Sequence, residues 1–393
     1  MATRIPPDWP PVRTVDTPEA LRDALPAWRR APVLGVDTES NSFYAYHDRL
    51  CLLQLSTPED DFIVDPLRLG PELRAINELF ADPGIVKVFH SAEFDLMLLR
   101  KDLGAGVRGL FDTQVAMTLL RHQRTGLAAL IESIYGLELS KKEQRSDWGR
   151  RPLTPEQIAY ARVDTHFLPD LHRRLLGELV DSQLLAAADG EFRRLEREVL
   201  PAREPDPEGW RRLKGARAFD GPMAARLRRL WRWREETARE RDLPPFRVLG
   251  NDALLDLAAR PPADVRALGT RAGVGWNKAR KLGAPILEAL QAGDQEGPPE
   301  PAPAADAAER RRQRLRRDNQ ESLRRWRKQA AAALGLPSER LLHRRHLEEV
   351  ARRLPRTREE LLRTIPMTDW QREHLEASLL DVLARLPDPE QST

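Results

Sequence analysis

The stretch PVLGVDTES, residues 32–40, places two carboxylates directly after a short apolar run. A run of aliphatic residues bounded by turn residues predicts a buried β-strand. Side chains two positions apart on a strand share a face, so Asp37 and Glu39 would lie side by side. Two adjacent negative charges are costly unless a cation or a proton offsets them. Asp and Ser are also common turn residues at strand ends, so the rest of the chain decides between these two interpretations.

Length and composition set the first limits. A chain of 393 residues is long enough for two or three domains, each with its own core. The proline-rich, polar start MATRIPPDWPPVRT is not a secretory signal, and no apolar run is long enough to span a bilayer. The single cysteine, Cys51, excludes an intrachain disulfide and a zinc site built from cysteines. We therefore expect a soluble, cytoplasmic protein that does not associate with membranes.

Charge is distributed unevenly along the chain. Residues 1–200 contain 25 Lys and Arg against 31 Asp and Glu, a net charge of −6. Residues 201–393 contain 39 against 30, a net charge of +9. An acidic half joined to a basic half is expected where a site that needs cations is tethered to a part that holds a polyanion.

The two halves also differ in predicted secondary structure. The first half contains the strand-like runs PVLGVD, RLCLLQLST, DFIVD and IVKVFH, with helical patterns that begin near residues 71, 92 and 125. This order predicts an α/β domain with a mixed sheet flanked by helices. After residue 206 only amphipathic helical patterns remain, broken at Pro or Gly.

The second half repeats itself. LRRLWRWREETARERDLPPF, from Leu227, corresponds to SLRRWRKQAAAALGLPSERL, from Ser322, and GTRAGVGWNKARKLGAPILEAL and RTIPMTDWQREHLEASLLDVL close the two copies. Each copy suits a small helical bundle. The intervening GDQEGPPEPAPAADAAERRRQRLRR predicts an extended linker. We expect four parts: residues 1–205, 206–292, the linker 293–317, and 318–393.

Polar residues that suit the carboxylates of PVLGVDTES occur in two predicted helices. HSAEFDLMLLR, residues 90–100, places Asp95 in an otherwise apolar helix. A second helix opens at Thr154 with a predicted capping box, and its Tyr160 and Asp164 are four residues apart and share a face. Each of these residues alone is compatible with an ordinary helix surface, whereas their combination indicates a cluster of acids.

The order D-x-E, D, Y-x-x-x-D resembles the DEDD exonuclease superfamily, in the branch with a tyrosine in its third motif. SKKEQRSDWGRRPLTPEQIAYARVDTHFL, residues 140–168, resembles ribonuclease D, and the helical repeats resemble the HRDC domains that follow that nuclease. The resemblance covers residues 14–386. It implies a ribonuclease H-like mixed sheet in the first domain, two HRDC-like bundles, and stepwise 3′→5′ hydrolysis of RNA to nucleoside 5′-monophosphates.

The resemblance also implies roles for the five residues. Asp37 would bridge two divalent cations, Mg²⁺ or Mn²⁺, while Glu39 and Asp164 would complete the site of the ion that activates water. Asp95 would serve the second ion, and Tyr160 would orient the attacking water. Hydrolysis of a phosphodiester suits this chemistry, because two ions about 4 Å apart stabilise charge on both the attacking and the leaving oxygen.

Five further residues are weaker candidates for substrate contacts. His90 precedes the predicted Asp95 helix, Lys142 lies in a basic loop, and Trp148 either stacks on a base or anchors that loop to the core. Arg232 and Arg234 flank the tryptophans of the first helical repeat and are candidates for phosphate contacts. The ordinary alternatives are a strand-end histidine, a solvated loop and solvated helix faces.

The resulting hypothesis is a metal-dependent 3′→5′ exoribonuclease that acts as a monomer, with tRNA precursors implied by the resemblance alone. Nothing in the acidic cluster distinguishes ribose from deoxyribose, so a DNA exonuclease is the first alternative. The second is an adaptor that binds nucleic acid without cutting it. The intact set of four acids and a tyrosine argues against the adaptor.

Overall fold

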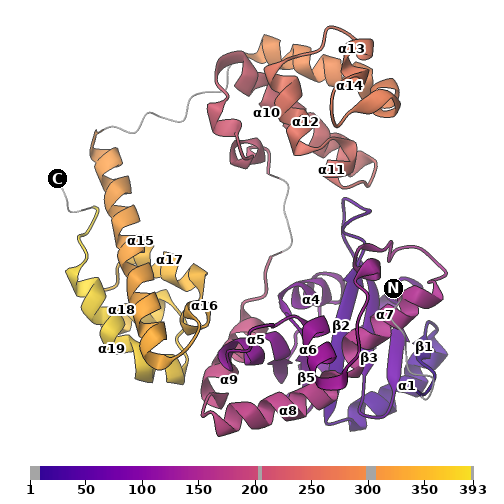
Figure 1. The fold of residues 1–393 in the computed structure, drawn as a ribbon, viewed down its shortest axis with the longest axis vertical. Helices are drawn as coiled ribbons and strands as arrows, with labels where there is room; N and C mark the ends of the chain where they lie inside the picture. Colours follow the sequence, from indigo (N-terminus) through magenta and orange to yellow (C-terminus); the bar gives the residue numbers. More distant parts are fainter. Residues whose placement is uncertain (1–8, 202–205, 298–306, 391–393) are drawn as a thin grey trace. The chain divides into compact units, whose positions relative to one another are not determined.

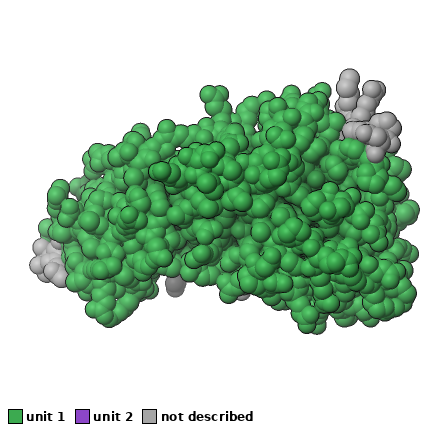
Figure 2. Space-filling view, turned by 90° about the horizontal axis from the view of Figure 1, so that it is seen from below, with its two compact units in different colours: residues 1–39, 50–201, 305–393 green, residues 40–49, 202–304 purple. Residues whose placement is uncertain are grey.

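The computed structural model describes residues 9–201, 206–297 and 307–390 (Figure 1). Contacts divide the chain into two compact units. The first contains residues 1–39, 50–201 and 305–393, and the second contains residues 40–49 and 202–304. Figure 2 shows the first unit as one green surface that includes the second helical repeat. Among the described residues, no helix is long and apolar enough to cross a membrane.

A single mixed sheet forms the centre of the first unit. Its strands in the described part of the chain are β1 (Arg13–Val15), β2 (Val33–Ser40), β3 (Leu50–Ser56), β4 (Asp61–Val64), β5 (Val86–Phe89) and β6 (Leu110–Asp112). Their order is β1-β4-β3-β2-β5-β6; β3 and β4 are antiparallel, whereas β2, β5 and β6 run parallel. The four strand-like runs are confirmed as β2 to β5, and the edge strands β1 and β6 were not predicted.

Helices cover both faces of this sheet (Figure 1). They are α1 (Pro18–Arg30), α2 (Pro66–Leu69), α3 (Asn77–Ala81), α4 (Glu93–Leu98), α5 (Thr113–Leu119), α6 (Leu127–Tyr135), α7 (Pro155–His166), α8 (Leu168–Asp181) and α9 (Leu185–Arg197). Every residue of β3 is buried, which requires cover on both sides. On one side Leu52 belongs to a cluster with Trp148 and with Ala161 of α7, which also includes the fully buried Cys51; on the other side Leu53 belongs to the main core. Cys51 is therefore a core residue, as expected.

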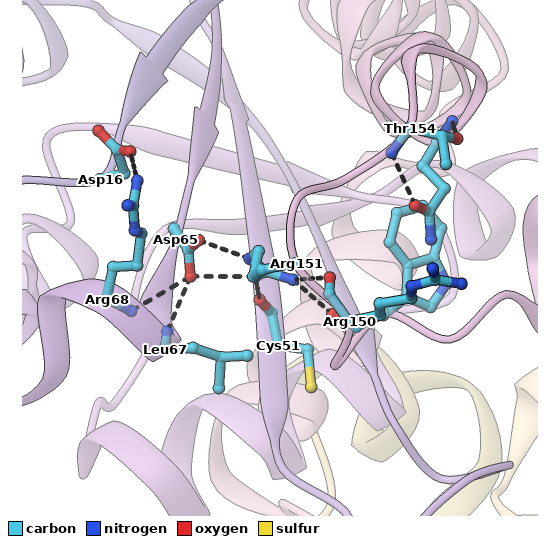
Figure 3. A network of polar contacts seen from close by, with 10 residues as sticks. Asp16, Cys51, Asp65, Leu67, Arg68, Arg150, Arg151 and Thr154 are labelled. Atoms are coloured by element: carbon cyan, nitrogen blue, oxygen red, sulfur yellow. Dashed lines mark hydrogen bonds and ion pairs between the residues drawn. The ribbon is translucent and has the colours of Figure 1, made fainter.

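Arg151 fastens the segment before α7 to the sheet (Figure 3). Its guanidinium donates to both carboxylate oxygens of Asp65, at 2.6 and 3.0 Å, and to the carbonyl oxygen of Cys51 at 2.7 Å. It also donates to the carbonyl oxygen of Trp148 at 2.7 Å. Asp65 in turn caps α2. Helix α7 then begins with the predicted capping box, formed by Thr154 and Gln157, so this network sets where the helix starts.

The second unit is helical in its described residues outside 40–49. Its helices are α10 (Gly221–Glu240), α11 (Pro245–Val248), α12 (Asn251–Ala259), α13 (Val265–Gly269) and α14 (Gly275–Glu296). Trp231 of α10 is buried in their common core, as expected for a small bundle.

The second helical repeat shares a core with the domain that contains the sheet. It consists of α15 (Ala307–Leu334), α16 (Ser338–Leu341), α17 (Arg344–Arg353), α18 (Arg358–Thr364) and α19 (Asp369–Arg385). Nε2 of His346 lies 2.7 Å from a carboxylate oxygen of Glu198. A Cβ at Gly190 of α9 would meet Thr368 at 2.8 Å, so α9 and this repeat pack closely.

The linker is shorter than the predicted range 293–317. Residues 293–296 belong to α14, residues 307–317 belong to α15, and residues 298–306 lie outside the described part of the chain. The basic segment ERRRQRLRR contains no Pro or Gly and is rich in strong helix formers. Glu309 and Arg312 also form an ion pair three residues apart. Helix propensity therefore prevails over charge repulsion in this segment.

We predict that Arg151→Met lowers the free energy of unfolding by about 2–3 kcal/mol, because it leaves the nearly buried Asp65 carboxylate without its partner. Arg22→Met is the matched control, since Arg22 pairs with Glu19 in solvent and such pairs contribute less than about 1 kcal/mol. Denaturant unfolding measures both variants. Equal effects would contradict an anchoring role for Arg151.

Candidate active site

Three elements that lie far apart in sequence bring the five expected residues into one cavity. The last residues of β2 supply Asp37 and Glu39, α4 supplies Asp95, and α7 supplies Tyr160 and Asp164. All five line a cavity of about 580 Å³. Carboxylate oxygens of Asp37, Glu39 and Asp164 lie within 4.8 Å of one another.

A glycine on β2 allows α7 to approach the strand closely. A Cβ at Gly35 would lie 2.6 Å from the carbonyl oxygen of Thr165 and 3.0 Å from Cβ of Leu168. Any side chain at this position would push the end of α7 away from the sheet. Because Gly35 precedes Asp37 by two residues and Thr165 follows Asp164, this contact sets the distance between the two carboxylates.

The backbone of β2 also orients Asp95. The Thr38 amide donates to Oδ1 of Asp95 at 3.1 Å, and the Thr38 hydroxyl donates to the same oxygen at 2.5 Å. Asp95 is 5% exposed. Thr38 lies between Asp37 and Glu39 and points to the other face of the strand, so one strand holds three of the four acids.

Burial and mutual repulsion raise the pKa of every carboxyl group in the cluster. Burial, followed by the charge of Asp164, raises the pKa of Asp37 well above its usual value. Glu39 has its pKa raised by burial and then by the charges of Asp37 and Asp164. Burial and the charge of Asp37 raise that of Asp95. Burial raises the pKa of Asp164 to about 7, although a hydrogen bond from Tyr160 opposes this shift.

Tyr160 keeps its proton at neutral pH. Burial and then the negative charge of Asp164 raise the pKa of its hydroxyl far above the ordinary tyrosine range. The hydroxyl donates a hydrogen bond to Asp164. Its ring lies 6.0 Å from that of Trp148, measured between centroids, at the edge of the core. The phenol is therefore held as a donor inside the acidic cluster.

The donor set fits a hard divalent cation. The clustered ligand atoms are all carboxylate oxygens, which Mg²⁺ and Mn²⁺ prefer. A cation among them would offset the repulsion that raises their pKa values. Asp37 and Glu39 thus tolerate each other because the site is built to hold positive charge.

Comparison with known proteins identifies the family. A 3'-5' exonuclease model matches residues 12–180, and the HRDC domain matches residues 223–290 and 319–383. Ribonuclease D of Xanthomonas oryzae pv. oryzae is 33% identical over 371 residues, which cover 93% of this chain and 97% of that protein. The chain belongs to the ribonuclease D family.

Two further comparisons agree with this assignment. The Escherichia coli RNase D structure superposes with a TM-score of 0.66 at 25% identity and covers 96% of this chain and all of that one. The exosome complex exonuclease RRP6 of Saccharomyces cerevisiae is 36% identical over 265 residues; the alignment covers 64% of this chain and 36% of that longer protein. Family membership confirms the expected ribonuclease H-like fold, the HRDC repeats and a 3′→5′ exoribonuclease. It also implies dependence on a divalent metal.

In this member of the ribonuclease D family, the weaker candidates near the catalytic cavity differ in whether they line it. His90 lines the cavity, and its Nδ1 lies 2.9 Å from the hydroxyl of Thr113. Trp148 is 1% exposed and belongs to the core, so stacking on a base is wrong for this residue. Lys142 is exposed but does not line the cavity, whereas its neighbour Lys141 does.

The two arginine candidates on α10 also differ. The Arg232 guanidinium donates to Glu208 at 2.9 Å and is 36% exposed. Arg234 is 3% exposed and donates to the carbonyl oxygen of Leu249 and to the side chain of Asn251. The predicted phosphate contact by Arg234 is therefore wrong, because its guanidinium is buried and hydrogen-bonded inside the bundle.

Several polar and aromatic cavity residues were not among the expected site residues. Phe94 is 44% exposed at the cavity, and Arg124 and Gln144 line it as well. Phe94 directly precedes Asp95 on α4, and an aromatic residue on the exposed side of an active-site helix was the one available signal. Arg124 lies in a polar loop whose position depends on the tertiary structure, so sequence alone offered no indication.

We predict that the metal-free protein becomes less stable between about pH 4 and pH 7. The folded state raises the pKa of Asp164 from 3.8 to about 7, so over this range it binds more protons than the unfolded state, and stability falls as pH rises. In EDTA, the melting temperature should decline from pH 5 to pH 8 less in Asp164→Asn than in wild type. Asp181→Asn, at an exposed aspartate on α8, is the control. A decline in Asp164→Asn as large as that in wild type would contradict the prediction.

Proposed function

We propose that the chain removes nucleotides one at a time from the 3′ end of single-stranded RNA and releases nucleoside 5′-monophosphates. The observation that carries this proposal is the convergence of four acids and a protonated tyrosine in one cavity. A cavity of about 580 Å³ falls in the range of small-molecule sites, which suits the end of a strand better than a duplex.

We further propose that the site holds two ions, Mg²⁺ or Mn²⁺. Bound there, they would supply charge stabilisation and an activated water. Asp37 is central in the cluster and would contact both, with Glu39 and Asp164 on one side and Asp95 on the other. Tyr160 would orient the attacking water through its hydroxyl, because its raised pKa keeps that hydroxyl a donor.

The other cavity residues would hold the substrate. Phe94 presents an exposed ring next to Asp95, on which the terminal base would stack. Lys141 and Arg124 carry positive charge in an otherwise acidic cavity and would pair with phosphates, Arg124 in exchange for Glu132, to which it donates at 3.1 Å. His90 would add a polar contact near the same helix.

RNA is the proposed substrate because a relative that matches almost the whole chain is a ribonuclease. We propose tRNA precursors as the native class on the family resemblance alone. The same acidic cluster would also cut DNA, so a DNA exonuclease is the alternative to test. The intact cluster opposes the adaptor hypothesis. We propose a monomer; a cytoplasmic location stays a prediction.

We predict that Asp37→Asn abolishes cleavage, because it removes the carboxylate shared by both proposed ions. Tyr160→Phe should lower turnover by about 10²–10⁴-fold, since it deletes one hydroxyl and leaves the carboxylates in place. The assay uses 5′-labelled single-stranded RNA and DNA of one sequence with Mg²⁺, Mn²⁺ or EDTA. Wild type should give a ladder that shortens RNA from its 3′ end, with metal only.

Asp181→Asn serves as the matched control for loss of one carboxylate outside the cavity. Faster shortening of DNA than of RNA would move the assignment to the DNA exonuclease. Binding without cleavage under every metal condition would leave the adaptor hypothesis. Unchanged turnover in Tyr160→Phe would remove the tyrosine from the proposed chemistry.

A further inference from the structure

The second compact unit presents an exposed tryptophan on the surface of the first helical repeat. Trp276 is 60% exposed, the largest value among the exposed large apolar side chains of the described residues. It lies in the first turn of α14, just after the tight turn that follows α13. Single apolar side chains are common on protein surfaces, so the support and the charges around this indole decide whether it has a function.

The indole is held by one face and open on the other. A Cβ at Gly269 would lie 2.7, 3.0 and 3.1 Å from three neighbouring atoms of the Trp276 six-membered ring. Such similar distances mean that the backbone at Gly269 lies over the ring face and not at its edge. The glycine therefore supports a flat aromatic surface whose opposite face remains in solvent.

The segment that contains the indole is basic, although Asp264 caps α13 directly before it and Asp256 lies 3.7 Å from Arg271 within it. Residues 265–287 contain five Lys and Arg and no Asp or Glu. Arg280 lies four residues after Trp276 and shares its helix face, and Lys281 occupies the next row. Arg266 and Lys281 are exposed and have no ion-pair partner within the described ranges 9–201, 206–297 and 307–390. This differs from α10, where Arg226, Arg228 and Arg232 all pair with acids.

Two further features attract an anion to this surface. Burial lowers the pKa of Lys278, and a bound anion would stabilise its ammonium form. Val274, the N-cap residue of α14, makes no side-chain capping hydrogen bond, so the first turn keeps amide donors at the positive end of a 22-residue helix.

The second helical repeat provides an internal comparison. Its Trp370 occupies the position equivalent to Trp276 but is half-buried against the core of the first unit. His374 replaces Arg280 and stacks on the indole, and the acidic Asp369 and Glu373 stand beside it. The equivalent tryptophan is thus partly covered in one repeat, where Asp369 pairs with Arg372, and open in the other, beside basic side chains that are unpaired among the described residues.

We propose that Trp276, together with Arg266, Arg280 and Lys281, is a docking platform for single-stranded RNA. A base stacks on the free face of the indole, and the adjacent phosphates pair with the basic side chains. The inference rests on the proposed function, because it assigns to the RNA substrate a second place of contact besides the catalytic cavity. Stacking tolerates every base, so the platform holds RNA without reading its sequence.

The test separates RNA binding from cleavage. Affinity for a labelled twelve-nucleotide oligo(A) is measured by fluorescence anisotropy with the full chain in EDTA. Trp276→Ala should weaken binding about tenfold, which corresponds to about 1.4 kcal/mol. Trp276→Phe retains a stacking ring. Its loss of affinity, in log Kd, should therefore be less than half of the loss in Trp276→Ala. Both variants should keep the far-UV circular dichroism of wild type, because the side chain is exposed.

Charge and support are tested with the same oligonucleotide. Lys281→Ala should reduce the slope of log affinity against log salt by about 0.7, the value for one phosphate contact on a single strand. Arg217→Ala is the matched control, at an exposed arginine of the same unit outside residues 265–287, and should change neither affinity nor slope. Gly269→Ala should weaken binding as Trp276→Ala does, because its Cβ displaces the supported ring.

A trinucleotide distinguishes failure of the platform from failure of the proposed function. It is long enough for the catalytic cavity alone, so wild type and Trp276→Ala should cleave it at the same rate with metal, while only wild type cleaves long RNA efficiently. Equal affinity of wild type and Trp276→Ala for oligo(A) would overturn the platform even if both cut RNA. Binding that depends on Trp276 in a protein that cuts no RNA would retain the platform and reject the proposed function.

Discussion

The close approach of α7 to β2 is the contact on which the catalytic arrangement depends. Gly35 has no side chain, and the carbonyl oxygen of Thr165 occupies the space that a Cβ would need. Without this approach, Asp164 would be farther from Asp37, and oxygen ligands for a metal must be close to one another. The same helix is fixed at its other end by the Thr154 capping box and by Arg151, which ties the preceding segment to the sheet.

A site built this way works against the stability of the fold that carries it. Several acids are buried together, and burial and mutual charge raise the pKa of each. Thr38 holds Asp95 with two hydrogen bonds, and Tyr160 donates to Asp164, so part of the cost is offset within the protein. A bound cation would reduce the remaining repulsion, which would couple metal affinity to the stability of the domain.

Much of the fold and the central site could be predicted from local patterns. The apolar runs identified β2 to β5, and the spacing of Tyr160 and Asp164 on one helix placed both in the cluster. Strands β1 and β6 have only three residues each and form because neighbouring strands pair with them, so local sequence does not reveal them. Burial was harder to predict: Arg234 and Trp148 belong to types that also bind nucleic acid, and only tertiary packing shows that both are enclosed.

The two helical repeats show how one sequence pattern serves different purposes. In the second repeat, His346 and Thr368 face α9, and this bundle contributes to the main core of the first unit. Its equivalent tryptophan, Trp370, is drawn into that packing and is no longer open for stacking. The first repeat has its own core, and the turn before α14 remains exposed. Packing against the nuclease domain covers the tryptophan of the second repeat. The equivalent tryptophan of the first repeat, with the basic side chains of residues 265–287, therefore remains available for RNA.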